Sequence, residues 1–252
     1  MLRGIYYAAS GMLAQQINGD TISNNIVNME SPGYKKDTAV MSSFQKVLLH
    51  YIVKEKDKPE AAAVGYTARG TQVAEVHTSF KQGELKATGR PLDVAIVGDG
   101  FFVVQYGEEV RLTRNGSFKI DSEGYLVTGN GLRVLGENGL IVLNDEDGIS
   151  ISDDGTIYED GQEVDRLLVV DFADRAVLTK AGENTFTAPD DAQAVQPQYS
   201  IRQGYLEMSN VDAAQEMTDL IMMMRIYEAN QRVVQTYDKV LEQAVREVGN
   251  LK

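Results

Sequence analysis

The hydrophobic positions change their period along the chain, which predicts helices at both ends and a β-rich middle. Near the N-terminus, apolar residues recur every three or four positions from Leu2 to Ile17, as on one face of an amphipathic helix. The stripe fades into polar residues, and Pro32 then disfavours helical backbone in the residue before it. Gly33 completes the stop. We therefore expect an N-terminal helix over residues 1–30.

The last part of the chain carries a second helical stripe. Apolar positions from Val211 to Val248 follow heptad-like spacing, with no proline or glycine before Gly249. Ser209 and Asn210 are good N-cap residues for this helix. Such a helix would be about 57 Å long and would need a partner for its stripe. The matching stripe lies at the N-terminus, so we expect a coiled coil that pairs the two termini, with the C-terminal helix in residues 205–252.

Three consecutive methionines lie in the C-terminal stripe. The cluster is typical of an adaptable binding surface, although core packing explains Met224 equally well. Met222 and Met223 point elsewhere on a helix, which indicates a second contact. Polar residues such as Gln231 and Asp238 fall in or beside the stripe, either exposed or fixing its register.

The middle of the chain is typical of antiparallel β-structure. Between residues 81 and 204, short apolar or alternating runs such as "FFVVQ" and "LLVVDF" are separated by Asn-Gly and Asp-Gly pairs, including Asp160-Gly161. These pairs are strong hairpin signals because both residues tolerate positive φ. Residues 31–80 give a mixed pattern and predict a junction and an extended linker. Within them "SSFQKVLLHYI" fits a short helix or strand, and residues 48–70 fit a linker or extended arm.

The fold class that follows is α+β. N- and C-terminal helices are expected to pair as a coiled-coil stalk, with an inserted antiparallel all-β domain and an extended linker. The expected divisions are listed by residue range: N-terminal stalk helix 1–30, junction and linker 31–80, β-rich body 81–204 and C-terminal stalk helix 205–252.

Composition and motifs favour a structural role over catalysis. The net charge of −13 argues against a nucleic-acid partner, and the absence of cysteine excludes disulfides and thiolate sites. Neither His50 nor His77 has a second histidine at ligand spacing. The "NDEDG" motif of residues 144–148 lacks the ligand pattern of a calcium loop. We expect no catalytic residue, no cofactor, no metal site and no small-molecule substrate.

No targeting segment is evident. The N-terminal residues lack a long apolar core and a small-residue cleavage site, so we expect no secretory signal peptide. No run approaches the roughly 18 apolar residues of a membrane span, so we expect no membrane insertion. These features fit a chain that stays in the cytoplasm or leaves the cell with its N-terminus uncut.

Four blocks of the sequence, in order, resemble the bacterial flagellar rod and hook proteins. "NNIVNMESPGYKK" (24–36) resembles the segment after the first helix of that family. "TGRPLDVAIVGDGFFVV" (88–104), "LTRNGSFKIDSEGYLVTGNGLRVLG" (112–136) and the stretch from Gly204 to Leu241 resemble successive later blocks. Residues 151–174 further resemble rod proteins of the F and G type, with F slightly favoured. The similarity covers nearly the whole chain, although residues 48–70 match poorly.

The resemblance implies a structural subunit of the flagellar basal-body rod. Members of the family polymerise into a helical axial tube that transmits torque from motor to hook and encloses the export channel. The implied partners are copies of the chain, other flagellar rod and hook proteins, and the flagellar type III export apparatus. The implied location is the bacterial flagellum basal body, reached without a cleaved signal peptide.

Three sets of residues are expected to contact other subunits. They are the N-terminal seam, the junction and the C-terminal seam, with the following members: Leu2, Ile5, Ala9, Met12 and Leu13; Asn24, Asn25, Pro32, Gly33 and Tyr34; Met217, Leu220, Ile221, Met224, Tyr227, Val234 and Leu241. At the junction, the asparagine amides are expected to face neighbouring chains.

Two other functions compete with this one. A non-polymerising flagellar export or assembly adaptor would use the terminal helices to dock one partner. A hydrolase acting on cell-wall glycan would need two converging carboxylates, and the sequence offers no obvious pair.

Overall fold

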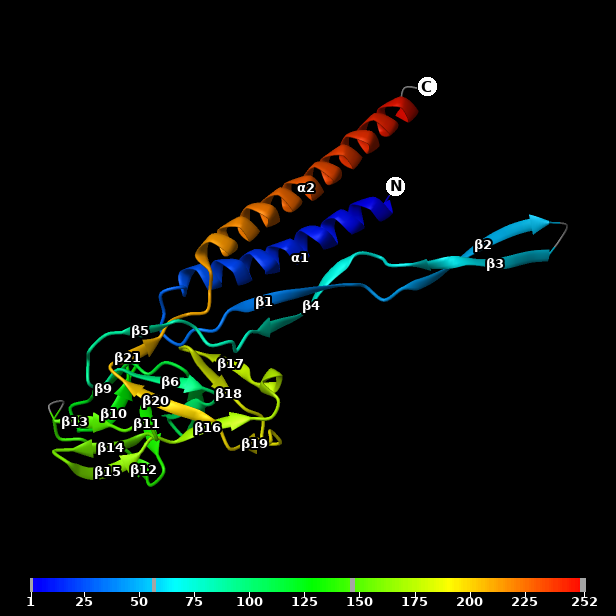
Figure 1. Ribbon diagram of the computed structural model, residues 1–252. Helices are drawn as coiled ribbons and strands as arrows, with labels where there is room; N and C mark the ends of the chain where they lie inside the picture. The colour runs from blue at the N-terminus through cyan, green and yellow to red at the C-terminus, as the bar shows by residue number, and fades with distance from the viewer. Residues whose placement is uncertain (1, 56–57, 146–147, 250–252) are drawn as a thin grey trace. The chain divides into compact units, whose positions relative to one another are not determined.

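The computed structural model describes residues 2–55, 58–145 and 148–249. Helix α1 (Leu2–Val27) opens the chain, helix α2 (Ala213–Gly249) ends the described part, and antiparallel strands occupy most of the residues between them (Figure 1). The α+β class predicted from the sequence is therefore confirmed. The chain forms two compact units, which we call the helical unit (residues 1–26, 37–77 and 213–252) and the β unit (27–36 and 78–212).

In the helical unit, α1 and α2 run antiparallel and lie side by side (Figure 1). Gly4 of α1 faces the ring of Tyr237, and a Cβ atom added to Gly11 would lie 2.9 Å from Nδ2 of Asn230. A Cβ atom on Gly19 would lie 2.5 Å from Cε of Met223. Glycine costs about 1 kcal/mol relative to alanine inside a helix. Close approach to α2 explains why α1 carries it at these positions.

The half-buried positions of α2 repeat with heptad spacing. They recur at alternating intervals of three and four residues, as follows: Leu220, Met223, Tyr227, Asn230, Val234, Tyr237, Leu241 and Ala244. Leu220, Tyr227, Val234 and Leu241 were expected on this face. Met223 was expected to point elsewhere but packs toward α1, and Met224, for which core packing was one expectation, is exposed, as is Met222. The apolar period was right, but the stripe is wider than the contact surface of α1.

A strand pair contacts α1 as well. Strands β1 (Asp37–Ser43) and β4 (Thr71–Thr78) form a two-stranded sheet. Gln15 of α1 donates a hydrogen bond from Nε2 to Sδ of Met41 at 3.7 Å, and the backbone N–H of Thr71 donates to Oγ of Ser10 at 3.3 Å. Helix α1 therefore has contacts both with α2 and with this strand pair.

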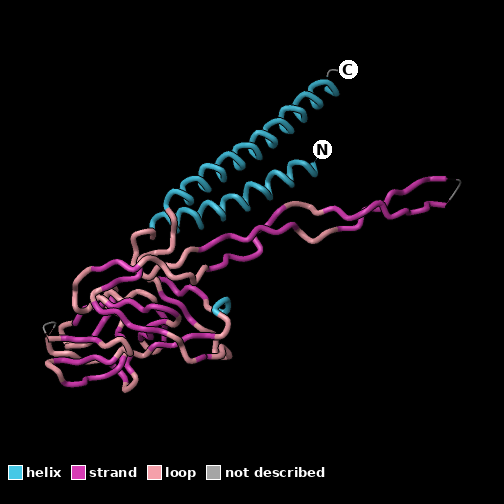
Figure 2. Tube along the Cα trace, in the orientation of Figure 1, coloured by secondary structure: helices cyan, strands magenta, loops and turns pink. Residues whose placement is uncertain are grey.

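The segment expected to be an extended linker forms a long antiparallel hairpin. Strand β2 (Val47–Glu55) pairs with strand β3 (Lys58–Thr67), and the two continue as a narrow ribbon (Figure 2). Much of β2 is β-branched or aromatic, which favours a strand over a helix or a coil. Residues 48–70 were expected to form a linker or an extended arm, and the pairing of β2 with β3 fits an extended arm rather than a flexible linker.

The β unit contains the remaining strands, which pair antiparallel. Their bounds are β5 (Leu85–Ala87), β6 (Val94–Gly98), β7 (Phe101–Tyr106), β8 (Glu109–Thr113), β9 (Phe118–Ile120), β10 (Leu126–Thr128), β11 (Arg133–Gly136), β12 (Gly139–Leu140), β13 (Ile149–Ile151), β14 (Thr156–Glu159), β15 (Gln162–Arg166), β16 (Val169–Phe172), β17 (Thr179–Gly182), β18 (Thr185–Thr187), β19 (Ala194–Val195), β20 (Tyr199–Gln203) and β21 (Tyr205–Glu207). A short 3₁₀ helix, η1 (Arg175–Val177), precedes β17.

The largest sheet is built around β7. Its main order is β17-β18-β8-β7-β11-β10-β9, with β12, β16 and β19 joined to it. Strands β13, β14 and β15 form a second sheet, and β20 pairs with β6 and β21 with β5. At the turn between β14 and β15, Asp160 and Gly161 have φ of 50° and 81°, as the Asp-Gly pair predicted.

Strand β7 separates two hydrophobic cores. Phe102 and Val104 belong to the larger core, where the ring of Phe102 lies 5.2 Å from that of Phe118. Phe101 and Val103 point the other way, into a smaller core with Leu112, Leu178 and Phe186. Successive strand residues face opposite sides of a sheet, so burial on both sides explains the unbroken run "FFVV".

Candidate interaction surfaces and the junction

The turn after α1 is built into the β unit by a glycine. Gly33 has a φ of +70°, and a Cβ atom there would collide with the backbone of Arg114. Its N–H donates to the carbonyl of Glu207 at 2.7 Å, and Asn184 Nδ2 donates to the carbonyl of Pro32 at 2.7 Å. The Pro-Gly pair thus allows a close approach of backbones that no larger residue would permit.

A buried carboxylate binds two cations behind this turn. Glu207 accepts hydrogen bonds from Lys35 Nζ at 2.5 Å, from the N–H of Gly83 at 2.9 Å and from Arg114 Nη1 at 3.3 Å. The side chains of all three charged residues are 2% exposed or less. Burial lowers the pKa of Lys35 and of Arg114, and the charge of Glu207 partly offsets that effect.

The chain segments after α1 and before α2 lie next to each other in the β unit. Lys35 Nζ also donates to the carbonyl of Lys81 at 2.8 Å. The N–H of Lys36 donates to Oδ1 of Asn210 at 2.7 Å, and Asn210 Nδ2 donates to the carbonyl of Ser79 at 2.8 Å. Asn210 was expected to cap the second helix. Its side chain instead binds Lys36, Ser79 and Lys81 of the β unit, and α2 begins at Ala213.

The asparagine-rich motif closes the turn between α1 and β1. Asn25 is 1% exposed, and its Nδ2 donates to the carbonyl of Asp37 at 2.8 Å and to Oε2 of Glu216 at 3.1 Å. The N–H of Asp37 donates back to Oδ1 of Asn25 at 3.0 Å. An amide is suited to this place because it both donates and accepts. It stabilises the chain reversal from within the helical unit.

A second ion cluster lies in the β unit. Arg175 donates to both carboxylate oxygens of Asp171, at 2.8 Å each, and forms an ion pair of 2.6 Å with Asp99. Burial raises the pKa of Asp171, but hydrogen bonds from Arg175 and from the backbone of Phe172 outweigh it, so the pKa is lowered. The hydrogen bonds that Arg175 donates to Asp171 raise the pKa of Arg175. No local sequence pattern predicts this ion cluster or the one around Glu207, because both join residues far apart in the chain.

The expected junction contacts divide between buried and accessible residues. Asn25, Gly33 and Tyr34 are buried against their own chain, Pro32 is half-buried and Asn24 is exposed. The expectation that the asparagine amides face neighbouring chains is therefore corrected for Asn25, whose amide binds within its own chain. A subunit contact at the junction remains a prediction for the accessible members.

The expected seam residues also divide. On α1, Ile5 and Met12 are half-buried, Ala9 and Leu13 are exposed, and the side chain of Leu2 lies outside the described part of the chain. On α2, Met217, Ile221 and Met224 are 52%, 54% and 52% exposed. These three lie beside the half-buried stripe and remain largely accessible. Their contact with another subunit remains a prediction.

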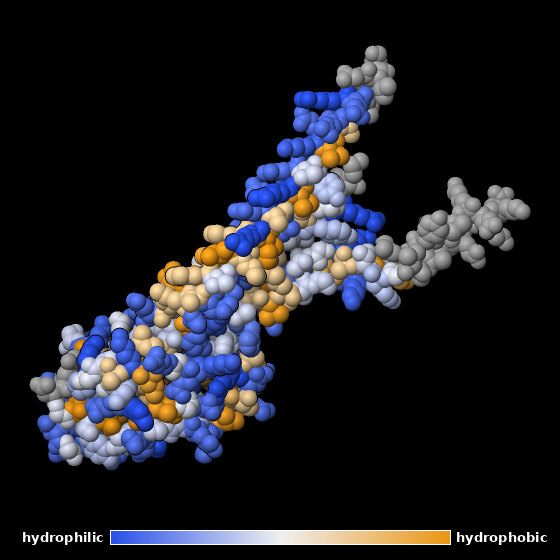
Figure 3. Space-filling model, turned by 45° about the horizontal axis from the view of Figure 1, so that its top comes forward, coloured by the Kyte–Doolittle hydropathy of each residue, from blue (hydrophilic) through white to orange (hydrophobic). Residues whose placement is uncertain are grey.

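Apolar side chains remain exposed on both helices. On α1 these include Tyr6, at 70% exposure, and Leu13, at 61%. On α2 the exposed apolar residues are the following: Met217, Ile221, Met222, Met224, Ile226, Val233, Val240 and Val245. Hydrophobic residues are visible along the helical unit in Figure 3, next to hydrophilic ones. Tyr6 and Ile226 were not among the residues expected to contact other subunits. The positions of Gly4 and Gly11 in the helix contact could have indicated which residues lie outside it.

No group of three or more potential metal ligands occurs among the described residues. His77 is exposed on β4, and the side chain of His50 lies outside the described part, as do residues 146 and 147 of the "NDEDG" motif. Asn144 and Asp145 of that motif bind the Glu159 carboxylate. Neither helix, over its described length, is long and apolar enough to cross a membrane.

Three family models match successive parts of the chain. The model described as flagella basal body rod protein matches residues 5–35. The flagellar hook protein FlgE/F/G D1 domain matches residues 95–159, and the flagellar basal body rod FlgEFG protein C-terminal model matches residues 202–247. The three matches cover α1 and the junction, the core strands of the β unit, and β21 with α2.

Curated relatives are similar over nearly their whole length. The flagellar basal-body rod protein FlgG of Agrobacterium fabrum is 34% identical, covering 95% of this chain and 97% of the relative. FlgG of Borreliella burgdorferi is 34% identical over 96% and 97% of the two chains. The flagellar hook-basal body complex protein FlhO of Bacillus subtilis is 30% identical over 100% of both. These names do not support the slight preference for the F type.

Proposed function

This chain belongs to the family of flagellar basal-body rod proteins, and we propose that it is a structural subunit of the basal-body rod, polymerising into a helical tube. The observation that carries this function is the similarity to FlgG relatives at 34% identity over at least 95% of the chain and 97% of each relative. A subunit of this kind is a structural protein rather than an enzyme, and its place is the flagellar basal body.

The exposed helix surface supports polymerisation. Helix α2 packs one stripe on α1 and keeps apolar residues on both sides of that stripe, among them Met217 and Ile221 on one side and Ile226 and Val233 on the other. Exposed apolar surface of this extent is typical of a protein-protein contact. Contacts between unlike surfaces, repeated without closure, build open helical polymers. We infer that copies of the chain cover these faces in the rod.

The helix pair is proposed to act as a coiled-coil stalk. The heptad repeat of half-buried residues along α2 and the glycines facing it from α1 support that geometry. In the proposed tube the paired helices form the wall around the export channel, and the rod transmits torque from the motor to the hook. Other rod and hook proteins are the proposed neighbours along its axis.

Export through the flagellar type III apparatus, without a cleaved signal peptide, is part of the same proposal. It is supported by the family to which the chain belongs. The absence of cysteine is compatible with it, because no disulfide could hinder passage of an unfolded chain.

Quantitative immunoblotting of detergent-stripped hook–basal bodies from the source organism tests the function. A structural rod subunit copurifies in a fixed ratio to the hook subunit. Protein found only in the cytoplasm or the medium would contradict the proposal and favour an export or assembly adaptor. Light scattering over a concentration series gives an independent check, since an adaptor keeps a constant mass while a rod subunit grows or precipitates.

A further inference from the structure

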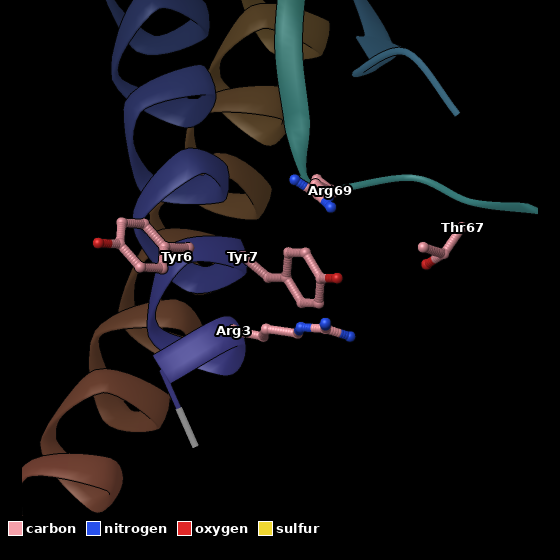
Figure 4. A pocket seen from close by; sticks show the side chains of 5 residues that line it. All are labelled: Arg3, Tyr6, Tyr7, Thr67 and Arg69. Carbon is pink, nitrogen blue, oxygen red and sulfur yellow. The ribbon is translucent and has the colours of Figure 1, made fainter. Parts of the chain in front are cut away.

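Two guanidinium groups share a pocket on the helical unit. Arg3 of α1 and Arg69, which lies between β3 and β4, line a cavity of about 390 Å³ together with Tyr6, Tyr7 and Thr67. Figure 4 shows Arg3 and Arg69 on either side of the Tyr7 ring. In the described ranges, neither guanidinium has a carboxylate within ion-pair distance. Two like charges held near one another favour the binding of an anion between them.

The surface beside this pocket is apolar. A second cavity of about 580 Å³ shares Tyr6 and Arg69 with the first and extends along α1. Its remaining lining residues are the following: Ala9, Ser10, Leu13, Phe44 and Gln45. We call the two cavities together the α1 groove. From Leu13 to Arg3 the groove changes from apolar to cationic over a helix length of about 15 Å.

Helix α2 carries a surface stripe with the matching order. Met217, Ile221, Met224 and Glu228 follow one another at intervals of four, three and four residues, so they lie on one face of the helix. All four are exposed. The stripe changes from apolar to acidic over about 16 Å. The Glu228 carboxylate has one ion-pair contact among the described residues, an exposed one of 4.0 Å to Arg232, which is weak at that distance and exposure.

We propose that the α1 groove binds this α2 stripe of a second copy of the chain, an interaction that rests on the proposed rod function. The second copy's helix runs antiparallel to α1. Its acidic end lies in the pocket between Arg3 and Arg69, and its methionines cover the apolar part of the groove. The pairs brought together are Arg3 with Glu228, Tyr6 with Met224, Ala9 with Ile221, and Leu13 with Met217. Three of the pairs are between nonpolar residues or an aromatic ring and a methionine, and the fourth joins opposite charges, so the order of apolar and charged residues along the two surfaces is complementary.

The register of this contact makes it open-ended. Within one chain Gly4 lies opposite Tyr237, whereas in the contact between copies Arg3 lies opposite Glu228. Because Arg3 would lie opposite residue 238 in the packing within one chain, the second copy is shifted by about ten residues, or ~15 Å, along the helix axis. Because the groove and the stripe are different surfaces of the same chain, each copy presents both of them. A repeated contact of this type extends a polymer without closing it.

Cysteine cross-linking between copies tests the register, and the cysteine-free chain gives no background. Full-length Ala9→Cys is mixed with full-length Ile221→Cys under assembling conditions and then oxidised. We expect a disulfide-linked dimer of the two variants. The matched control pairs Ala9→Cys with Gln235→Cys, an exposed position on the same stripe but about 21 Å further along α2, too far for a disulfide. Equal or greater linkage of the control, or no linkage in an assembled polymer, overturns the contact.

Charge reversal tests the anion pocket. The double variant Arg3→Glu, Arg69→Glu should lose sedimentable polymer, and Glu228→Arg in the same chain should restore it. Arg225→Glu, on another face of α2, is the control and should assemble. Far-UV circular dichroism of each free chain verifies that the helices persist. Assembly unaffected by the double reversal, or lost without restoration, overturns the proposal. A wild-type chain that never assembles overturns the rod function itself, whereas assembled wild type without the expected linkage contradicts only this contact.

Discussion

Lys35 Nζ and the carboxylate of Glu207 form an ion pair of 2.5 Å in which neither side chain is more than 1% exposed. The two residues are far apart in sequence, one following α1 and the other ending β21. Burying either charge without the other is costly, since a buried ion loses its hydration. The pair therefore stabilises the arrangement in which the segment that leaves α1 lies beside the segment that leads to α2.

Glu207→Gln is predicted to destabilise the β unit by about 3–5 kcal/mol. Glutamine keeps the shape of the side chain but leaves the ammonium of Lys35 and the guanidinium of Arg114 buried without an opposite charge. Urea unfolding followed by circular dichroism measures the change. Glu109→Gln is the control, because its ion pair with Arg111 is exposed on the Glu109 side and should contribute less than about 1 kcal/mol. Equal midpoints for Glu207→Gln and wild type would contradict the prediction.

The sequence predicted the secondary structure of most regions, but it did not predict the contacts between residues that are far apart in the chain. Periods of 3.6 and of 2, with Asn-Gly and Asp-Gly pairs, depend on local geometry, so the helices and the antiparallel body could be expected. The ion pair of Lys35 with Glu207 joins distant positions and has no local signature. Two paired strands replaced the expected linker because pairing gives an extended ribbon the hydrogen bonds that a lone segment lacks.

For the candidate contact residues on α2 as well, the sequence predicted the helix but not its contacts. A stripe of apolar residues identifies a helix that must pack, but a wide stripe does not tell which part faces α1. Glycines decide that register, since Gly4, Gly11 and Gly19 lie where α2 approaches most closely. Met223 thus packs inside the chain, and Met224 remains exposed.

Gly4→Ala is predicted to weaken the pairing of α1 with α2 by about 1–3 kcal/mol, because the new methyl group would overlap the ring of Tyr237. At an exposed helical position the same change would stabilise by about 1 kcal/mol. Thermal unfolding of the full chain, followed by the helical circular dichroism signal, gives the size and sign of the change in stability. Adding Tyr237→Ala should remove the overlap, so the double variant should be more stable than the two single effects predict.

Gly129→Ala, in a turn where a Cβ atom would meet nothing within 4 Å, is the control for that cycle. Additive effects of Gly4→Ala and Tyr237→Ala would show that the two positions are not in contact.

Asp171→Asn is predicted to cost more stability at pH 7 than at pH 3. The pKa of Asp171 is lowered in the folded chain, since the hydrogen bonds from Arg175 outweigh the effect of burial. Its ionised form therefore stabilises the fold above the unfolded pKa of about 3.9, and that contribution is lost as the pH falls through the folded value. Losing hydrogen bonds to a charged group should cost on the order of 2 kcal/mol at pH 7. Urea midpoints at the two pH values measure the difference.

For this pH dependence, Asp190→Asn provides the comparison, because Asp190 is exposed. It should change stability little at either pH. The role assigned to Asp171 would be rejected if Asp171→Asn cost the same at pH 7 and at pH 3.

Met224→Asp is predicted to abolish polymerisation while the subunit itself stays folded. Met224 is 52% exposed and lies off the stripe that packs on α1, so a carboxylate there remains hydrated in the free chain. In a contact between copies the same carboxylate would be buried in an apolar surface without a partner, at a cost of several kcal/mol. Sedimentation of the concentrated protein measures assembly, and circular dichroism measures folding. Arg225→Asp, at the neighbouring exposed position, should still assemble, since that residue lies on another face of the helix. Normal assembly of Met224→Asp would exclude this face of α2 from the subunit contact, whereas loss of folding would show that Met224 acts within the chain.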